Sequence, residues 1–271
     1  MRGFLGEKIG EGTSADIHAW APGQVVKLFK AGTSRRTSRD EARMTRAVFA
    51  AGAPAPEVLD EVTLEGRFGI VLGRLDGPTL LHLSRSGAMT PGQTGAILAG
   101  LLMSVHRTPP PPEVFVLRGW MDAAFRLSGL VPTHIARGIL ALIDRLQPAD
   151  GLCHADPHPG NVIMTADGPR LVDWTWAIRA PAAFDLVWCH ILFTEFVPEQ
   201  VADPERPRAY NAAMQSEYAR LAGTSQAALR AAMELYLPIA LIRLFVLSGG
   251  PASAQWKRLI QRAEAALRTE D

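Results

Sequence analysis

The sequence predicts an α+β fold with two lobes: a small N-terminal lobe built from an antiparallel sheet and one helix, and a larger lobe that is mainly helical. Residues 1–75 alternate short apolar runs with turn residues, whereas residues 78–271 show helical periodicity interrupted by one hairpin. The pattern changes at about residues 72–77, which we take as the connector between the lobes. A chain of 271 residues is long enough to bury a core in each lobe.

The N-terminal lobe is expected to hold two hairpins and one helix. The helix is predicted at 37–51, with Ser38 as its N-cap, Glu41 closing a capping box and Gly52 ending it. Turn residues, Ala-Pro-Gly-Gln in the first hairpin and Glu-Gly in the second, separate the apolar runs. The strands are expected at 16–20, 25–29, 57–64 and 67–72.

The C-terminal lobe is expected to be a set of helices around a second small β element. Thr90 and Pro91 have the residue types that favour an N-cap and a first helical position. The turn 166–168 separates two apolar runs, 162–164 and 170–173, and so predicts a hairpin. The helices are expected at 90–106, 120–129, 132–146, 183–195, 208–222, 226–247 and 252–268.

Composition and charge exclude several classes of protein. Lys and Arg number 28 and Asp and Glu number 27, so the chain lacks the basic excess that nucleic acids and anionic membranes attract. The N-terminus lacks the apolar segment of a signal peptide, and the apolar stretch 235–247 is too short to span a bilayer. Two cysteines cannot form a disulfide framework. We therefore expect a cytoplasmic protein that binds neither nucleic acid nor membrane.

A glycine-containing turn at 9–17, with the sequence IGEGTSADI, lies between two expected strands. Glycine lets the backbone turn tightly and approach a phosphate with its N–H groups. Taken alone, however, these residues are explained more simply by an ordinary hairpin turn. A Rossmann-type turn fits less well, because a strand rather than a helix is expected to follow.

Lys27 is one of only four lysines in the chain and lies inside the apolar run 25–29. It could protect the edge of a sheet, or it could bind a phosphate if a carboxylate holds it in place. Glu41 is a candidate for that carboxylate, but it also fits the capping box with Ser38. The residues alone leave both alternatives open.

The segment 151–174 carries the strongest polar pattern. Asp156 is followed by Asn161 and, after the expected hairpin, by Asp173, so the three side chains can converge at one end of that hairpin. Asn and Asp oxygens suit Mg²⁺, and a further carboxylate suits the orientation of a hydroxyl nucleophile.

Zinc is an alternative for the same segment, with Cys153, His154 and His158 as ligands. A cysteine directly followed by a histidine lacks the usual spacing of structural zinc sites. We expect His154 instead to be a buried histidine with structural hydrogen bonds.

Together these features have the order and spacing of a kinase-type phosphoryl-transfer site. The chain resembles the aminoglycoside phosphotransferase and choline kinase-like branch of the protein-kinase-like fold. The sequence HADPHPGN at 154–161 is similar to that family's His-Gly-Asp-x-His-x-x-Asn loop. Asp173-Trp174 is similar to its metal motif, and Phe184-Asp185-Leu186 to its Asp-containing helix start. Ala155 stands where the family usually has glycine or arginine.

The resemblance implies an enzyme that uses ATP and Mg²⁺ to phosphorylate a hydroxyl of a small molecule. Asp156 would act as the base, and Asn161 and Asp173 would carry the metal. His154 and Asp185 would support the catalytic loop. The residues implied to bind the nucleotide are Ile9, Gly10, Gly12, Thr13, Ser14, Ile17, Val25, Lys27, Glu41, Leu72, Gly73 and Leu75.

The acceptor stays open at this stage. An acidic run could bind a cationic aminoglycoside or be a solvated loop, and three tryptophans could surround a quaternary amine or belong to the core. The residues concerned are Glu195, Glu199, Asp203 and Glu205, and Trp174, Trp176 and Trp188.

Two other functions remain. One is a nucleotide-binding pseudokinase with a regulatory role. The other is a protein Ser/Thr kinase, against which the short interval from Asp173 to Phe184 and the missing Ala-Pro-Glu segment argue.

Overall fold

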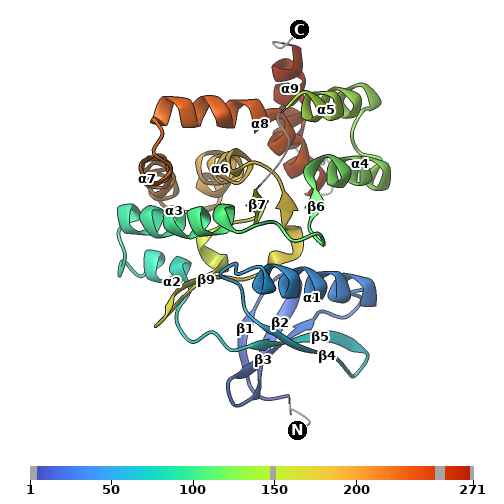
Figure 1. Ribbon diagram of the computed structural model, residues 1–271, viewed down its shortest axis with the longest axis vertical. Helices are drawn as coiled ribbons and strands as arrows, with labels where there is room; N and C mark the ends of the chain where they lie inside the picture. Colours follow the sequence, from blue (N-terminus) through green and yellow to red (C-terminus); the bar gives the residue numbers. More distant parts are fainter. Residues whose placement is uncertain (1–4, 147–150, 248–253, 269–271) are drawn as a thin grey trace.

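The computed structural model describes residues 5–146, 151–247 and 254–268, with a β-sheet at one end and most helices at the other (Figure 1). The sheet has the strand order β1-β2-β3-β5-β4, and its neighbouring strands are antiparallel. This confirms the predicted α+β architecture. The strands are β1 (Lys8–Glu11), β2 (Ala15–Ala21), β3 (Gln24–Phe29), β4 (Val58–Leu64) and β5 (Arg67–Gly73).

Helix α1 (Arg35–Ala50) begins two residues earlier than the sequence predicts. Its N-cap is Ser34, whose hydroxyl accepts from the Thr37 N–H at 3.1 Å, and not Ser38, which is buried within the helix. The predicted capping box was therefore wrong, because the extended backbone of Ser34 already satisfies the first turn. This leaves the side chain of Glu41 free of any capping role.

Helix α1 lies between the sheet and the helical part of the molecule (Figure 1). Ala42 packs with Phe29 and Ile70 beneath the sheet, while Met44 and Val48 belong to the large core of the helical part. One helix thus contributes to both cores and fixes the sheet relative to the segment that carries the polar motif.

The helical part follows the predicted order, with differences at element ends. Thr90 and Gln93 form a capping box at the start of α3, with Pro91 at the first helical position. The helix predicted at 183–195 ends at Ile191 and continues as a π-helical turn. The first two residues of the helix predicted at 252–268 lie outside the described residues. The helices are α2 (Leu80–Arg85), α3 (Pro91–Arg107), α4 (Leu117–Ser128), α5 (Thr133–Arg145), α6 (Ala182–Ile191), α7 (Glu205–Ala222), α8 (Gln226–Leu247) and α9 (Ala254–Arg268).

Several short elements had no recognisable sequence signal. Helix α2 has one and a half turns, and the strands of a three-stranded sheet with the order β6-β10-β7 are two residues long, too short to show periodicity. The strands of this sheet are β6 (Phe115–Val116), β7 (Leu152–Cys153) and β10 (Ile178–Arg179). The hairpin predicted from 162–164 and 170–173 is formed by β8 (Val162–Thr165) and β9 (Gly168–Leu171). The short helical turns are η1 (Pro159–Asn161), η2 (Trp174–Trp176), η3 (Leu192–Phe196) and η4 (Val197–Gln200).

The β8–β9 hairpin is tied to the N-terminal part by backbone hydrogen bonds. The Leu171 N–H donates to the Pro54 carbonyl at 2.7 Å, and the Met164 N–H donates to that of Pro78 at 2.9 Å. These contacts hold the two ends of the hairpin against the segment after α1 and the connector after β5.

Among the described residues, no helix combines the length and apolar character that crossing a membrane requires.

Helices α3 and α7 pack so closely at Gly95 that a Cβ atom there would lie 2.4 Å from the Tyr210 carbonyl oxygen. We expect Gly95→Ala to lower the free energy of unfolding by about 1–3 kcal/mol, as overpacking does. Gly100→Ala in the same helix is the control, because a Cβ there meets nothing within 4 Å. It should be neutral or stabilise by up to about 1 kcal/mol. Urea unfolding measures both, and equal stabilities would contradict this packing.

Candidate active site

Lys27 lies in β3, a central strand, so it does not protect a sheet edge. Its Nζ is 2.5 Å from Oε1 of Glu41 and 3.4 Å from Oδ1 of Asp173. Lys27 and Glu41 are buried, and the side chain of Asp173 is 39% exposed. Strand β3, helix α1 and the end of the β8–β9 hairpin therefore meet at one ammonium group.

The charges of these three groups depend on one another. Burial disfavours the ammonium of Lys27, but the nearby carboxylates of Glu41 and Asp173 outweigh it and raise its pKa. Burial raises the pKa of Glu41, and Lys27 opposes that effect. Burial alone would also raise the pKa of Asp173. The charge of Lys27 and the hydrogen bond from the Thr175 hydroxyl outweigh it and lower this pKa below its usual value. Asp173 is thus ionised at neutral pH and Lys27 is protonated.

The loop 154–161 is held from behind by Asp185, which is fully buried in α6. Its Oδ2 accepts from the His154 N–H at 2.9 Å, and its Oδ1 accepts from the Ala155 N–H at 2.7 Å. Ala155 has φ +65°, the left-handed conformation that favours glycine, so the alanine here is strained. The carboxylate of Asp185 therefore holds the loop in a backbone shape that the residue type does not favour.

His154 is fully buried and connects two parts of the site. Its Nε2 donates to the Val172 carbonyl at 3.1 Å, and its Nδ1 accepts from the Asp156 N–H at 3.3 Å. Burial lowers the pKa of His154, so the ring is neutral and has the tautomer that suits both partners. The ring links the backbone before Asp173 to that of Asp156.

Helix α6 contacts four consecutive loop residues through one face. Besides Asp185, Trp188 donates from its indole Nε1 to Oδ1 of Asp156 at 3.2 Å, and the Cys189 thiol donates to the Pro157 carbonyl at 3.1 Å. Residues three and four positions apart lie on the same helix face, which explains why these three side chains reach neighbouring loop positions. Nothing in the sequence pattern identified Trp188 as a partner of Asp156.

Asn161 and Asp173 lie at the same end of the β8–β9 hairpin. The Val172 N–H donates to the Asn161 carbonyl at 2.9 Å, and the Asn161 side-chain amide donates to the Asp156 carbonyl at 3.1 Å. That amide contact leaves the Asn161 side-chain oxygen for another partner, beside an ionised and partly exposed Asp173. One amide oxygen and one carboxylate are oxygen donors of the kind that Mg²⁺ prefers, so the residues fit this ion.

The other expected nucleotide-binding residues line the N-terminal part. Gly12 donates its N–H to the Ala15 carbonyl at 2.8 Å in the β1–β2 turn, in which Thr13 and Ser14 are exposed. The N–H of Gly73 donates to the Glu57 carbonyl at 2.9 Å. Gly73 can therefore offer only its carbonyl oxygen to a ligand. Val25 is buried, Ile9 is exposed, and Gly10, Ile17, Leu72 and Leu75 are partly buried.

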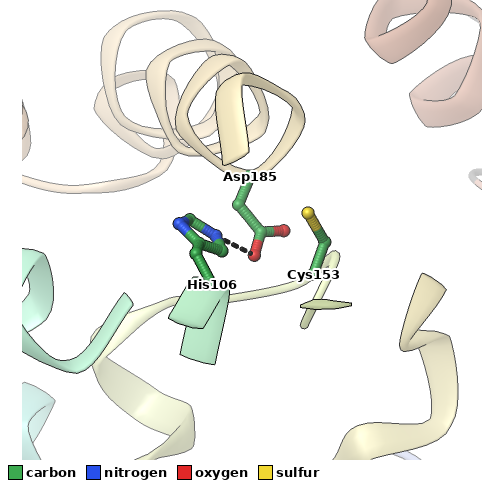
Figure 2. A group of neighbouring side chains, drawn as sticks. All are labelled: His106, Cys153 and Asp185. Carbon is green, nitrogen blue, oxygen red and sulfur yellow. Dashed lines mark hydrogen bonds and ion pairs between the residues drawn. The ribbon is translucent and has the colours of Figure 1, made fainter. Parts of the chain in front are cut away.

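The residues considered for zinc do not form a site. The Cys153 thiol donates to the Ala180 carbonyl, His154 is engaged as described, and Nδ1 of His158 accepts from the Gly160 N–H. His106, Cys153 and Asp185 do point toward one another (Figure 2). Burial raises the pKa of the Cys153 thiol, which keeps it protonated and a poor metal ligand.

His106 in that group has two hydrogen-bond partners. Its Nε2 contacts Oδ2 of Asp185 at 3.1 Å (Figure 2). Its Nδ1 contacts the Tyr218 hydroxyl at 2.7 Å. The group is therefore a hydrogen-bond network that links α3, α6 and α7 to the loop, rather than a metal centre.

The features considered for the acceptor are occupied by partners within the chain. Glu195 pairs with Arg262, Asp203 accepts from the first N–H groups of α7, and Glu205 pairs with Arg208. The side chain of Glu199 lies outside the described residues. Trp174 is fully buried, and Trp176 and Trp188 face the guanidinium of Arg243.

Comparison with known proteins agrees with this geometry. The sequence model of the phosphotransferase enzyme family matches residues 7–224 of this chain. None of the curated proteins matches the chain in sequence.

Solved structures with the same fold include a choline/ethanolamine kinase family protein from Mesorhizobium loti (TM-score 0.59, 16% identity, covering 96% of this chain and 87% of that one). Another is a choline kinase from Cryptosporidium parvum (TM-score 0.55, 14% identity, covering 99% and 89%). A third is an aminoglycoside phosphotransferase from Streptomyces rimosus (TM-score 0.53, 20% identity, covering 85% and 89%). At these identities the likeness establishes the fold.

The buried Lys27–Glu41 pair makes a stability prediction. We expect Lys27→Met to lower the free energy of unfolding by about 3 kcal/mol, because it leaves the Glu41 carboxylate buried without its partner. Lys27→Met combined with Glu41→Met should recover much of this loss, since neither charge remains. Urea unfolding of the variants tests this, with Lys30→Met as the partly exposed control, for which a much smaller change is expected. If the double variant lost as much free energy of unfolding as the two single variants together, the pairing of Lys27 with Glu41 would be contradicted.

Proposed function

We propose that this chain, which belongs to the phosphotransferase enzyme family, transfers the γ-phosphate of ATP to a hydroxyl group of a small molecule. The observation that carries the proposal is the convergence of Lys27, Glu41 and Asp173 beside the loop that presents Asp156. These groups lie on elements far apart in sequence, yet each has a charge or a free oxygen suited to a phosphoryl-transfer site.

The N-terminal part, residues 1–75, would bind the nucleotide. Lys27, held by Glu41, would neutralise the α- and β-phosphates. The backbone N–H groups of residues 12–15 that are not already bonded, as that of Gly12 is to the Ala15 carbonyl, would contact the remaining oxygens. Ile17 and Val25 would pack on the adenine. At the connector, the carbonyl of Gly73 and the backbone of Leu75 would form hydrogen bonds with it. Asn161 and Asp173 would hold Mg²⁺, which when bound neutralises charge on the transferred group.

Asp156 would act on the acceptor, which the part from residue 78 onward would bind. Its Oδ1 is engaged by Trp188, so Oδ2 is the oxygen that would accept the proton of the acceptor hydroxyl. The hydroxyl oxygen would bond to the γ-phosphorus while the bond from that phosphorus to ADP breaks. His154 and Asp185 would keep Asp156 in place and supply positioning rather than covalent chemistry.

The acceptor is proposed only by class: an aminoglycoside-like molecule, an amino alcohol or a sugar. In support, a structure of similar fold was solved as an aminoglycoside phosphotransferase in complex with ADP and streptomycin.

The two cysteines are buried free thiols, which is consistent with a reducing cytoplasm.

Nucleotide binding can be tested by thermal unfolding with and without Mg-ATP. A ligand at one hundred times its dissociation constant adds about 2.7 kcal/mol, which for this size corresponds to a rise in Tm of several degrees at about 2–4 °C per kcal/mol. We expect this rise in the wild type and not in Asp173→Ala. Asp167→Ala, in the exposed β8–β9 turn, is the control and should retain it. A rise that survives in Asp173→Ala would remove Asp173 from the metal site.

Turnover tests the role of Asp156. ADP release is measured with water as the acceptor and with a panel of aminoglycosides, amino alcohols and sugars. We expect Asp156→Asn to lower kcat by about 10²–10⁴ while the Mg-ATP shift in Tm is retained. Full activity in Asp156→Asn would refute the assignment. Nucleotide binding without turnover in the wild type would instead favour a regulatory, non-catalytic protein.

A further inference from the structure

Behind the loop, a buried tryptophan and a buried arginine have no place in the nucleotide or metal assignments. Trp188 is 3% exposed, and its indole Nε1 is 3.2 Å from Oδ1 of Asp156. Among the described residues, the polar group recorded near Oδ2 of Asp156 is the distant Nε2 of His158, at 3.8 Å, and the Asp156 side chain is 30% exposed. The two oxygens of the carboxylate are therefore not equivalent: Oδ1 accepts a hydrogen bond from a buried side chain, and Oδ2 has no such partner among the described residues.

Arg243, in α8, is fully buried and lies against the other side of the same indole. The centre of its guanidinium is 4.2 Å from the Trp188 ring centroid. Its Nη1 donates to the Ala155 carbonyl at 2.8 Å, whereas Nε and Nη2 have no hydrogen-bond partner among the described residues. Burial lowers the pKa of Arg243 to about 10, so the group still carries its charge at neutral pH.

Aromatic rings surround this buried charge. Trp120, Phe184 and Trp176 have their ring centroids 5.1, 5.8 and 6.0 Å from the guanidinium centre. Attraction between a cation and the faces of aromatic rings strengthens when both are removed from water. A buried charge is costly even with the carboxylates of Asp156 and Asp185 near enough to favour it, so its presence directly behind the loop calls for a role that an apolar side chain would not fill.

We propose that Trp188 and Arg243 are positioning residues for Asp156, an inference that rests on the proposed role of Asp156 as base. The indole N–H fixes Oδ1, which turns Oδ2 toward the acceptor. The guanidinium holds the indole by stacking and the loop by its bond to the Ala155 carbonyl. Arg243 of α8 thus holds the carbonyl of Ala155, and Trp188 of α6 holds the side chain of the next residue, Asp156.

Trp188→Phe tests this, since phenylalanine keeps an aromatic ring against Arg243 but lacks the N–H, together with one of the two fused rings of the indole. With water as the acceptor, kcat for Mg-dependent ATP hydrolysis should fall about tenfold, the effect of one hydrogen bond to a charged group. The KM for ATP should not change. Ile139→Val, a buried change in the distant α5, is the control for loss of stability and should leave kcat unaffected.

A double-mutant cycle separates positioning from a general loss of stability. In an Asp156→Asn background, Trp188→Phe should have little further effect on kcat, because the oxygen it orients no longer acts as a base. Arg243→Lys, which keeps the charge, should retain more activity than Arg243→Met. A tenfold loss that persists in the Asp156→Asn background, or an unchanged kcat in Trp188→Phe, would overturn the proposal.

The contact can also be measured without turnover. The indole ¹H–¹⁵N cross-peak of Trp188, assigned by its loss in Trp188→Phe, should shift in Asp156→Asn and stay in place in Asp167→Asn. A peak that does not respond to Asp156→Asn would overturn the proposal. If Asp156→Asn shifts the peak but loses no activity, the role of Asp156 as base fails as well. Loss of activity in Asp156→Asn alone, with Trp188→Phe fully active, removes only the positioning role.

Discussion

A carboxylate with no exposure to solvent, that of Asp185, accepts hydrogen bonds from two successive backbone N–H groups and from the ring of His106. Each buried N–H would cost about 1–3 kcal/mol if its acceptor were removed. The two N–H groups can point at one carboxylate because Ala155 adopts a left-handed backbone conformation. The strain at this alanine is thus a consequence of how the loop is anchored, and the orientation of Asp156 follows from it.

The same anchoring makes helix α6 the scaffold of the site. Asp185, Trp188 and Cys189 lie on one helix face and contact the loop from His154 to Pro157. On the opposite side, helix α1 carries Glu41, which holds Lys27 against Asp173. The site therefore forms between two helices that share the large core, of which α1 also packs against the sheet.

Short-range patterns predicted much of this arrangement. The loop 154–161, the hairpin and the order of the helices are encoded by residues close together in the sequence, and the structure has them in that order. The start of α1 was misplaced because Ser34 and Ser38 both suit an N-cap, and only the backbone conformation selects between them. With Ser34 as the N-cap, Glu41 has no capping role, and its side chain is the partner of Lys27.

Contacts between distant residues could not be read in the same way. Arg243 lies 88 positions from the carbonyl it binds, and in the sequence it is one charge inside an apolar stretch. Two of the three tryptophans considered for a cationic ligand, Trp176 and Trp188, face this arginine instead, and the third, Trp174, is buried against His154. The sequence correctly indicates that an aromatic group suits a cation, but it does not say whether that cation comes from a ligand or from the chain. Because Arg243 supplies the cation here, Trp176 and Trp188 are already engaged within the chain and are not free to surround a cationic ligand.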